Sequence, residues 1–525
     1  MTKMPSTMRR MPFPVPWMPH LTENKAWPMR SQNHLKLTFF FIVAMCQYCM
    51  AGHYFWTPML ERAYLEATSL QLEEAEKTLA LAEAADPDNL MALHVANYVD
   101  FFRVYINEDE DEFKRLEKNR DIRLKRIEKE GDPSSPWHKF LLADIRLQWA
   151  LARLKFEQFT TAYFETNKAF KLLTSNVEAH PDFMPNYKDL GILHAMVGTV
   201  PDNYRWALDW FTSLEGTLKQ GREELQRVIT YAKSNRFIYE QEIYIYYAYL
   251  QLHLINDLEA AWDLVNEASL DPEENPLHCF VLANVAMRTG RADEAIRILE
   301  KAPKGKRYHP FHYLEYLMGL AKLQSLDLSA EQHFLNYVNH FKGFNFVKDA
   351  YQKLAWCRLL KGDFAGYKSY LELCRSKGKT IVGNDKSALN EANSGLIPAT
   401  ELLKARLLFD GGHYQRALEV LNAKNVNDYL SDRNRLEYLY RLARIEQALG
   451  KFEQALLLYD TVISEGKDAP WYFACRAALE KGHIYEQRRQ KALAVSAFEQ
   501  CLSIDPDEHK TGLHQQAKAG LRRLQ

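Results

Sequence analysis

Few residue groups in this sequence have the types and spacing that chemistry requires. Gly378, Lys379 and Thr380 have the order that ends a phosphate-binding loop, in which backbone amides and a lysine hold the phosphates of a nucleotide. That loop also needs a glycine five residues before Gly378, and this position holds Leu373. We therefore do not interpret the segment as a nucleotide-binding site.

Two other groups have the residue types of metal sites. His309 and His312 sit around Pro310, but no third ligand follows at a fixed spacing. Cys46 and Cys49 lie in an apolar run that has no second cysteine pair nearby. The sequence also lacks the Gly-x-Ser-x-Gly motif that presents a nucleophilic serine. It predicts no metal, no cofactor and no catalytic residue, so the protein is predicted not to be an enzyme.

Charge and cysteine content exclude two further classes. The 67 Lys and Arg residues balance 68 Asp and Glu residues, which leaves a net charge of −1 and no general basic surface for nucleic acid. Seven cysteines in 525 residues are too few for a disulfide scaffold, and the five outside the N-terminus are interpreted as small buried residues. For Cys475 and Cys501 a disulfide is the alternative, because they could face each other across one helical hairpin.

The N-terminus has its own composition. Residues 1–28 are rich in Met and Pro and have no helical or strand period, which predicts a disordered or untranslated leader with Met29 as the true start. A short basic stretch then precedes the apolar run 37–52, so residues 29–52 are predicted to be a signal peptide cleaved after Ala51. The protein would then be exported, to the periplasm or outside the cell. The alternatives are a membrane anchor through residues 37–52 and a buried first helix.

The rest of the sequence repeats. Small residues recur with a spacing of 38 and then 39 residues at Ala417, Ala455 and Ala494. Small residues let the two helices of a pair cross closely, aromatic residues fill the space between pairs, and a proline ends the second helix. The residues assigned to this packing are Ala405, Ala417, Ala443, Ala455, Gly482, Tyr485, Ala494, Phe498 and Pro506.

Such helices are apolar on one stripe only, so each pair must stack on the next. This predicts an all-α fold, a right-handed superhelical solenoid of antiparallel helix pairs. Residues 396–525 are predicted to hold the clearest repeats and a capping helix, and 236–395 similar pairs that end in a long exposed loop at 378–395. Residues 54–235 are predicted to be an irregular helical-repeat region, where Gly216 and Gly221 break the chain after a bend.

These repeats resemble the tetratricopeptide repeat family, closely over about 240–506 and loosely over 60–235. The resemblance implies a non-catalytic scaffold that binds a protein or extended peptide in a concave groove. Segments 191–225 and 341–363 are more narrowly similar to a eukaryotic tetratricopeptide family associated with lipid droplets and inclusion-body clearance. The alternative function is therefore a membrane-tethered assembly factor or a lipid-associated helical-repeat protein.

In a solenoid of this kind the first helix of each pair lines the groove. Its ninth position holds Arg406, Arg444 and His483 in three successive repeats, which predicts a basic ladder among aromatic neighbours. Guanidinium groups bind carboxylates and rings contact apolar side chains, so an acidic peptide would fit. The alternative is that Arg444 pairs within the protein, for example with Glu437. The predicted groove comprises Arg406, Arg444, His483, Tyr440, Phe409, Leu402, Tyr249 and Phe280.

Overall fold

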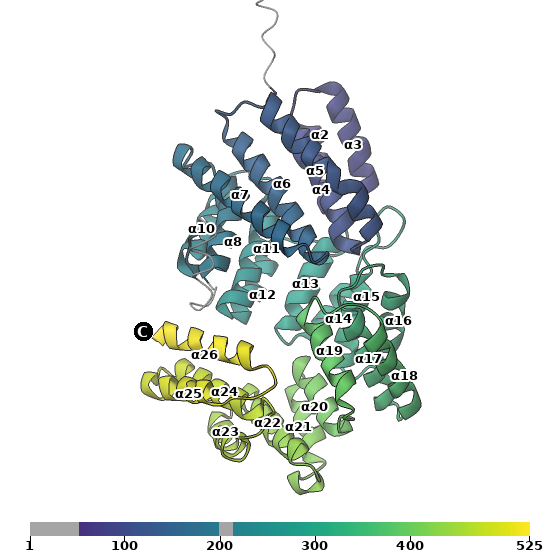
Figure 1. Ribbon diagram of the computed structural model, residues 1–525, viewed down its shortest axis with the longest axis vertical. Coiled ribbons are helices and arrows are strands. Elements are labelled where there is room, and N and C mark those ends of the chain that lie inside the picture. Colours follow the sequence, from purple (N-terminus) through teal and green to yellow (C-terminus); the bar gives the residue numbers. More distant parts are fainter. Residues whose placement is uncertain (1–51, 199–213, 525) are drawn as a thin grey trace, which may run out of the picture. The chain divides into compact units, whose positions relative to one another are not determined.

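Antiparallel helix pairs make up most of the regular structure in residues 52–198 and 214–524, which the computed structural model describes (Figure 1). These residues hold no β-strand, only two isolated bridges, Gly52 with Gly131 and His53 with Asn89. The predicted all-α solenoid of antiparallel helix pairs is confirmed. The predicted leader, and residues 29–51 of the predicted signal segment, lie outside the described residues. No helix within the described ranges is long and apolar enough to cross a membrane.

The N-terminal helices are long, and several begin at a side-chain cap. The hydroxyl of Ser135 accepts a hydrogen bond from the amide of Trp137, and Pro136 occupies the first helical turn, where no amide is needed. Asp109 caps the preceding helix, Glu110–Glu130, in the same way. The helices of this region are α2 Pro58–Thr68, α3 Leu72–Ala85, α4 Met91–Asn107, α5 Glu110–Glu130, α6 Pro136–Lys155, α7 Phe159–Ala179, α8 Pro185–Gly198 and α10 Leu218–Ala232.

The middle of the chain continues with shorter pairs. Its helices are α11 Glu240–Leu250, followed by a π-helical turn η1 Gln251–Ile255, then α12 Leu258–Glu267, α13 Pro276–Arg288, α14 Ala292–Glu300, α15 Tyr313–Gln324, α16 Ala330–His340, α17 Val347–Leu360, α18 Phe364–Ser376 and α19 Gly383–Ser394. The prediction of one long loop at 378–395 was wrong, because α19 occupies most of it. Asp385, Ala388 and Ala392 form a narrow buried stripe on α19, and α19 packs on α17 and α18.

The C-terminal part holds the most regular pairs. Its elements are α20 Thr400–Asp410, α21 Tyr414–Asn422, a 3-10 turn η2 Val426–Asp428, α22 Asp432–Ala448, α23 Phe452–Gly466, α24 Phe473–Gln487, α25 Lys491–Ser503 and α26 Lys510–Leu524. Gly412 and Gly450 turn the chain from the first helix of a pair to the second, with φ angles of 84° and 78° that favour glycine. Gly412 also lies so close to Gly290 that an added Cβ would be 1.8 Å from the Gly290 carbonyl oxygen.

The residues assigned to repeat packing lie inside these pairs. Ala405, Ala417, Ala443, Ala455, Ala494 and Phe498 are all fully buried. The Phe498 ring lies between α24 and α26, because a Cβ on Gly482 would be 2.3 Å from that ring and one on Gly520 would be 2.5 Å away. Tyr485 is half-buried, and α25 ends at Ser503, three residues before the buried Pro506.

Gly221 was expected to break the chain, but it does not. It lies inside α10, where an added Cβ would be 2.2 Å from the carbonyl oxygen of Gly191 in α8. Glycine is needed at this position because two helices approach closely, not because a helix ends there. Residues 199–213, which include most of the predicted bend, lie outside the described residues.

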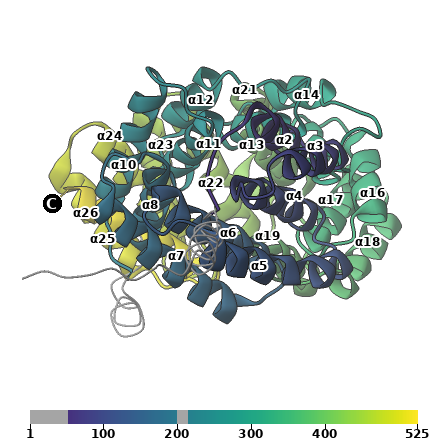
Figure 2. The same ribbon diagram turned by 90° about the horizontal axis from the view of Figure 1, so that it is seen from above.

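The N-terminal helices also contact the turns that precede α13, α15 and α17 (Figures 1 and 2). Glu108, between α4 and α5, has a left-handed φ of 51° and a buried carboxylate. One carboxylate oxygen accepts hydrogen bonds from the Asn345 side chain at 2.7 Å and from the backbone amides of Asn345 and Phe344 at 3.3 and 3.4 Å. The other accepts from Lys155 at 2.9 Å.

We predict that Glu108→Ala destabilises the protein, because two backbone amides and Lys155 lose their acceptor in a buried environment. The expected loss of unfolding free energy is about 2–4 kcal/mol. Urea unfolding measures that loss, and hydrogen exchange should become faster at the amides of Phe344 and Asn345. Glu110→Ala removes an exposed carboxylate from the first turn of α5 and is the matched control. Equal unfolding midpoints for the two variants would contradict the prediction.

Candidate functional site

Four of the predicted groove residues line one small cavity. Arg406 and Phe409 reach it from α20, and Tyr440 and Arg444 reach it from α22. Its volume is about 180 Å³, enough for one amino-acid side chain. The full lining is Ala405, Arg406, Phe409, Asp410, Tyr440, Arg441, Arg444 and Tyr472, and we call this set the arginine pocket.

Arg444 is held inside the protein. Its guanidinium donates to the Tyr440 hydroxyl at 2.9 Å, lies 3.5 Å from a carboxylate oxygen of Glu480, and covers the Phe409 ring at 4.8 Å from its centroid. Burial alone would raise the pKa of Glu480, but Arg444 and Arg476 hold it well below its usual value. Arg444 therefore pairs within the protein, as the alternative prediction stated, but its partner is Glu480 and not Glu437.

Arg406 is the most accessible of the three arginines in the pocket. Its guanidinium lies 3.9 Å from Asp410 one turn along α20, and 43% of its side chain is exposed. It also covers the ring of Trp356 at 5.1 Å from the centroid. Stacking on a ring leaves the guanidinium N–H groups at the edge free to donate, so Arg406 can bind an incoming anion without losing a close ion pair.

Three lining residues were not among the predicted residues: Asp410, Arg441 and Tyr472. Arg441 follows Tyr440, and its guanidinium pairs closely with Glu437 four residues earlier. Although burial opposes the shift, Arg441 holds the pKa of Glu437 below its usual value. The spacing of Glu437 and Arg441 was a readable signal for this pair. Tyr472 precedes α24, outside the helix positions that were considered, and nothing in the sequence pointed to it.

The other predicted groove residues do not line this pocket. Leu402 is 1% exposed and belongs to the apolar core around Ala405 and Leu408, so its assignment to the groove was wrong. The His483 ring packs on Phe498 at 5.4 Å between centroids, and its Nδ1 lies 3.7 Å from Glu486. Tyr249 stacks on His253, and Phe280 packs against Phe311 and Tyr313 in earlier helix pairs.

A larger cavity, of about 440 Å³, lies between α14, α15 and the connection that joins them. Four of its charged groups are arranged in pairs within the protein or at its edge, since His333 contacts Glu315 at 2.8 Å and Lys322 contacts Asp327 at 3.6 Å. Burial lowers the pKa of His309, which also lines this cavity, to about 4, so that its ring is neutral near pH 7. The arginine pocket has three guanidinium groups and one carboxylate in its lining, so it is the better candidate for binding an anionic group.

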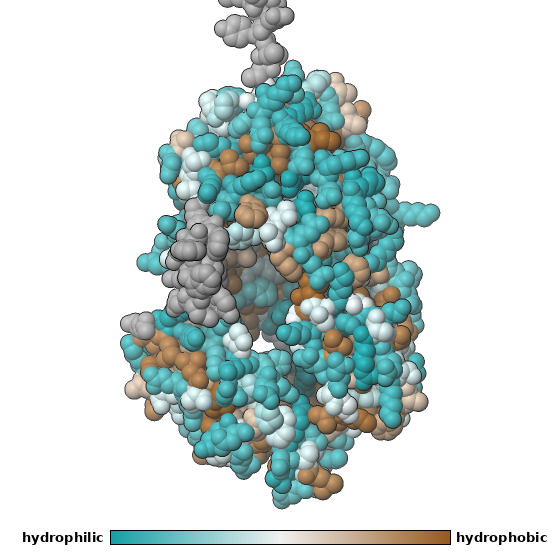
Figure 3. Space-filling model, viewed as in Figure 1, coloured by the Kyte–Doolittle hydropathy of each residue, from teal (hydrophilic) through white to brown (hydrophobic). Residues whose placement is uncertain are grey.

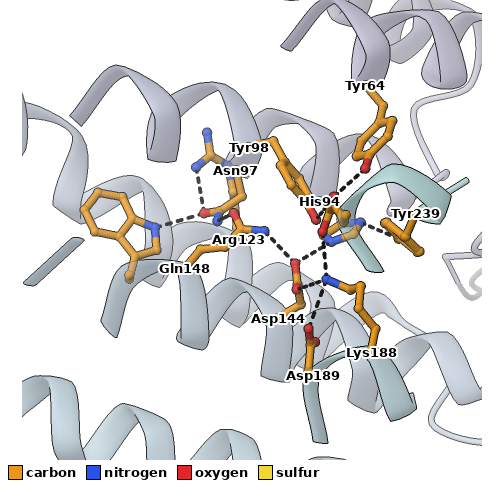
Figure 4. Close-up of polar contacts among 12 residues, drawn as sticks. Tyr64, His94, Asn97, Tyr98, Arg123, Asp144, Gln148, Lys188, Asp189 and Tyr239 are labelled. Carbon is orange, nitrogen blue, oxygen red and sulfur yellow. Dashed lines mark hydrogen bonds and ion pairs between the residues drawn. The ribbon is translucent and has the colours of Figure 1, made fainter. Parts of the chain in front are cut away.

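A buried charge cluster in the N-terminal half is the other concentration of titratable groups (Figure 4). Lys188 of α8 has three carboxylate neighbours, Asp144 at 3.2 Å, Asp189 at 3.0 Å and Glu242 at 3.0 Å. His94 of α4 contacts Asp144 at 2.8 Å. The Glu242 carboxylate also accepts hydrogen bonds from Tyr64 and Tyr98, so the cluster joins α2, α4, α6, α8 and α11.

The cluster has the residue types of a catalytic site but lacks its accessibility. Lys188 and His94 are 0% exposed, and the rings of Phe140, Tyr239 and Tyr246 surround the ammonium group. A substrate has no route to groups sealed in this way, so we interpret the cluster as packing between helices. Across residues 52–198 and 214–524, no group of three or more His, Cys, Asp or Glu side chains could hold a metal ion.

Residues 476–508, which cover most of α24 and all of α25, match the tetratricopeptide repeat family. The preceding pairs have the same buried small residues at the same spacing. The chain therefore contains a tetratricopeptide repeat in this part of its sequence. Tetratricopeptide folds are generally non-catalytic scaffolds that bind other proteins, through the extended surfaces that stacked repeats create.

Three solved structures are similar to this chain. The P58(IPK) tetratricopeptide domain has 14% identity and a TM-score of 0.22, with 78% of this chain and 94% of that chain covered. Yeast Tom70 has 14% identity and a TM-score of 0.24, with 88% of each chain covered. The Cut9–Hcn1 hetero-tetramer of the APC/C has 13% identity and a TM-score of 0.20, with 93% and 98% covered. No curated protein sequence matches the chain, so the narrower resemblance remains a prediction.

We predict different costs for two isosteric changes in the charge cluster. Burial would raise the pKa of Asp144, but Lys188 and His94 hold it low, so this carboxylate is charged. Burial raises the pKa of Asp189 well above its usual value, which favours the neutral form of this acid. Asp144→Asn should cost about 3 kcal/mol of unfolding free energy, and Asp189→Asn less than about 1 kcal/mol.

Urea unfolding of the two variants beside the wild type measures the difference. Lys168→Met, which removes an exposed charge from α7, controls for a general effect of charge on unfolding. Equal losses for Asp144→Asn and Asp189→Asn would show that the two carboxyl groups are not in different charge states.

Proposed function

We propose that this tetratricopeptide protein binds an extended peptide segment of a partner protein, and that an acidic side chain of the peptide enters the arginine pocket. The observation that carries the proposal is the accessible guanidinium of Arg406 at a pocket with aromatic walls. Arg406 supplies donors for a carboxylate, and the half-buried Tyr472 supplies an aromatic contact for an adjacent peptide side chain.

Charge balance around the pocket supports an acidic partner. Glu437 lies between Arg441 and Arg433, and Glu480 lies between Arg444 and Arg476. Each glutamate is thus shared by two arginines, and an arginine has five N–H donors. The shared glutamates leave donors unfilled on this surface, which favours a ligand that brings further carboxylates or carbonyl oxygens.

The location of the pocket also supports the proposal. It lies on α20 and α22, the first helices of two successive pairs, which line the inner surface of a tetratricopeptide solenoid. Figure 3 shows a hollow near the centre of the described part of the chain, between α12 and α13 on one side and α22 and α26 on the other. A hollow of this kind lets an extended segment contact several pairs at once.

We predict that Arg406→Glu weakens binding of acidic peptides about tenfold or more. The change removes a charge-assisted contact, and a loss of about 1.4 kcal/mol of binding free energy lowers the affinity tenfold. A peptide array that varies acidic and aromatic residues, probed with purified protein, identifies the ligands for titration by fluorescence anisotropy. Arg435→Glu is the matched control, because Arg435 lies on α22, is exposed and is not in the pocket. Equal binding by both variants and the wild type would rule out the pocket.

We also propose that the protein is exported. This proposal rests on the basic stretch, the apolar run and the small residues within 29–52. A fusion of residues 29–60 to a reporter enzyme should direct the reporter out of the cytosol, with removal of the first 23 residues of the fusion, through Ala51. A fusion in which Phe40 and Phe41 are changed to Glu should stay in the cytosol. Retention of the unaltered fusion in the cytosol would end this proposal, and an uncleaved fusion found in the membrane fraction would favour the membrane anchor.

A further inference from the structure

Two cysteine side chains meet inside the last repeat. The Sγ atom of Cys475 in α24 lies 3.6 Å from the Sγ atom of Cys501 in α25, and 3.4 Å from the carbonyl oxygen of Cys501. Both residues are fully buried. The two helices pack along their whole lengths as one antiparallel hairpin, so the two sulfur atoms remain neighbours as long as the hairpin is folded.

The pair differs from the other described cysteines. Cys279, Cys357 and Cys374 are also buried, and burial raises the pKa of each thiol, to about 12, 12 and 11. The hydrogen bond from Cys501 instead lowers the pKa of Cys475, while its own pKa is raised. The two thiols therefore interact directly with each other, and the one that loses its proton is the form that attacks a disulfide.

We infer that Cys475 and Cys501 are oxidised to an intramolecular disulfide when the chain folds in the presence of a disulfide oxidant. Cys475 loses its proton and attacks one sulfur of the oxidant, which forms a mixed disulfide and releases one thiolate. Cys501 then loses its proton and attacks the Cys475 sulfur, which forms the internal disulfide and releases the second thiolate. The two protein thiols lose two electrons, and the oxidant takes them together with the two protons to become two thiols.

The helical hairpin makes this bond geometrically accessible. A disulfide needs the two sulfur atoms about 2.05 Å apart, so the present separation must shorten by a sulfur rotation and a small helix shift. Burial determines when the bond forms, because a sealed pair is out of reach of an oxidant. Oxidation should therefore be fast while α24 and α25 assemble and slow once α26 covers them.

The bond would act on the helix that supports the arginine pocket. Arg476 follows Cys475, and its guanidinium donates to Glu480 at 2.7 Å, the carboxylate that also holds Arg444. A link between the start of α24 and the end of α25 restrains this corner of the repeat. Because the bond depends only on the folding of residues 473–503, the inference does not rest on peptide binding.

Refolding and mass spectrometry test the inference. The reduced, denatured full-length protein is refolded in oxidised and reduced glutathione, denatured without reductant and alkylated with N-ethylmaleimide. Digestion without reduction should yield a peptide that joins Cys475 to Cys501 in most molecules, and both thiols should escape alkylation. Native reduced protein exposed to the same buffer should react at least tenfold more slowly. Full alkylation of Cys475 and Cys501 after refolding would overturn the inference.

Variants separate the bond from general effects of cysteine loss. A reductant should lower the melting temperature of the wild type and of Cys357→Ala, which removes a buried cysteine from α17. It should leave the melting temperature of Cys501→Ala unchanged, because that variant cannot form the bond. A shift of equal size in all three proteins would overturn the inference, and if Cys501→Ala does not fold, the wild-type digestion still decides it.

Discussion

A single helix pair of this chain cannot cover its own apolar stripe, and the rest of the structure depends on the stacking that this requires. The constraint is most visible at Phe498. Its ring lies on Gly482 of its own pair and on Gly520 of the capping helix, and any side chain at either position would occupy the same space. In the preceding pairs, buried alanines allow the same close approach between helices. This approach sets the position of each pair relative to the next.

The N-terminal half meets the same constraint with different side chains. Its helices are longer, and five of them converge on a cluster of buried charges instead of on small residues alone. Removing Lys188, His94 and their carboxylate partners from water is costly unless all of them are paired. The cluster therefore adds little to stability but accepts only one arrangement of α2, α4, α6, α8 and α11. Specific pairing of this kind explains why the region departs from the repeat pattern while remaining helical.

The parts of the fold that depend on local pattern could be predicted from the sequence. Alanine spacing indicated the pairs from α20 onward, and one-stripe periodicity indicated the solenoid. In contrast, α19 was predicted as a loop because Gly383–Ser394 is polar and lies between glycines, and only three of its residues are buried. Its tertiary partners decide the structure, since the Asp385 carboxylate accepts hydrogen bonds from the amides of Phe346 and Asp349 at 2.7 and 2.9 Å.

Long-range contacts could not be predicted from one sequence. In the acidic run after Asn107, Asp109 caps α5, but Glu108 binds Asn345 far along the chain. Nothing in the local sequence separates these two acids. For the same reason, only part of the groove could be predicted. Helix position identified Arg406 and Arg444, whereas the partners that distinguish them, Asp410 and Glu480, could be assigned only from the folded arrangement.

That distinction shows how a repeat can combine stability with binding on one surface. Arg441 and Arg444 lie near glutamates that are largely buried, so their guanidinium groups are committed to holding neighbouring helices together. Arg406 has an exposed carboxylate at 3.9 Å and an aromatic ring beneath it, so it can exchange its weak partner for a ligand at little cost to the fold. Position nine of the first helix therefore has two uses in successive repeats, and the adjacent acid determines which one applies.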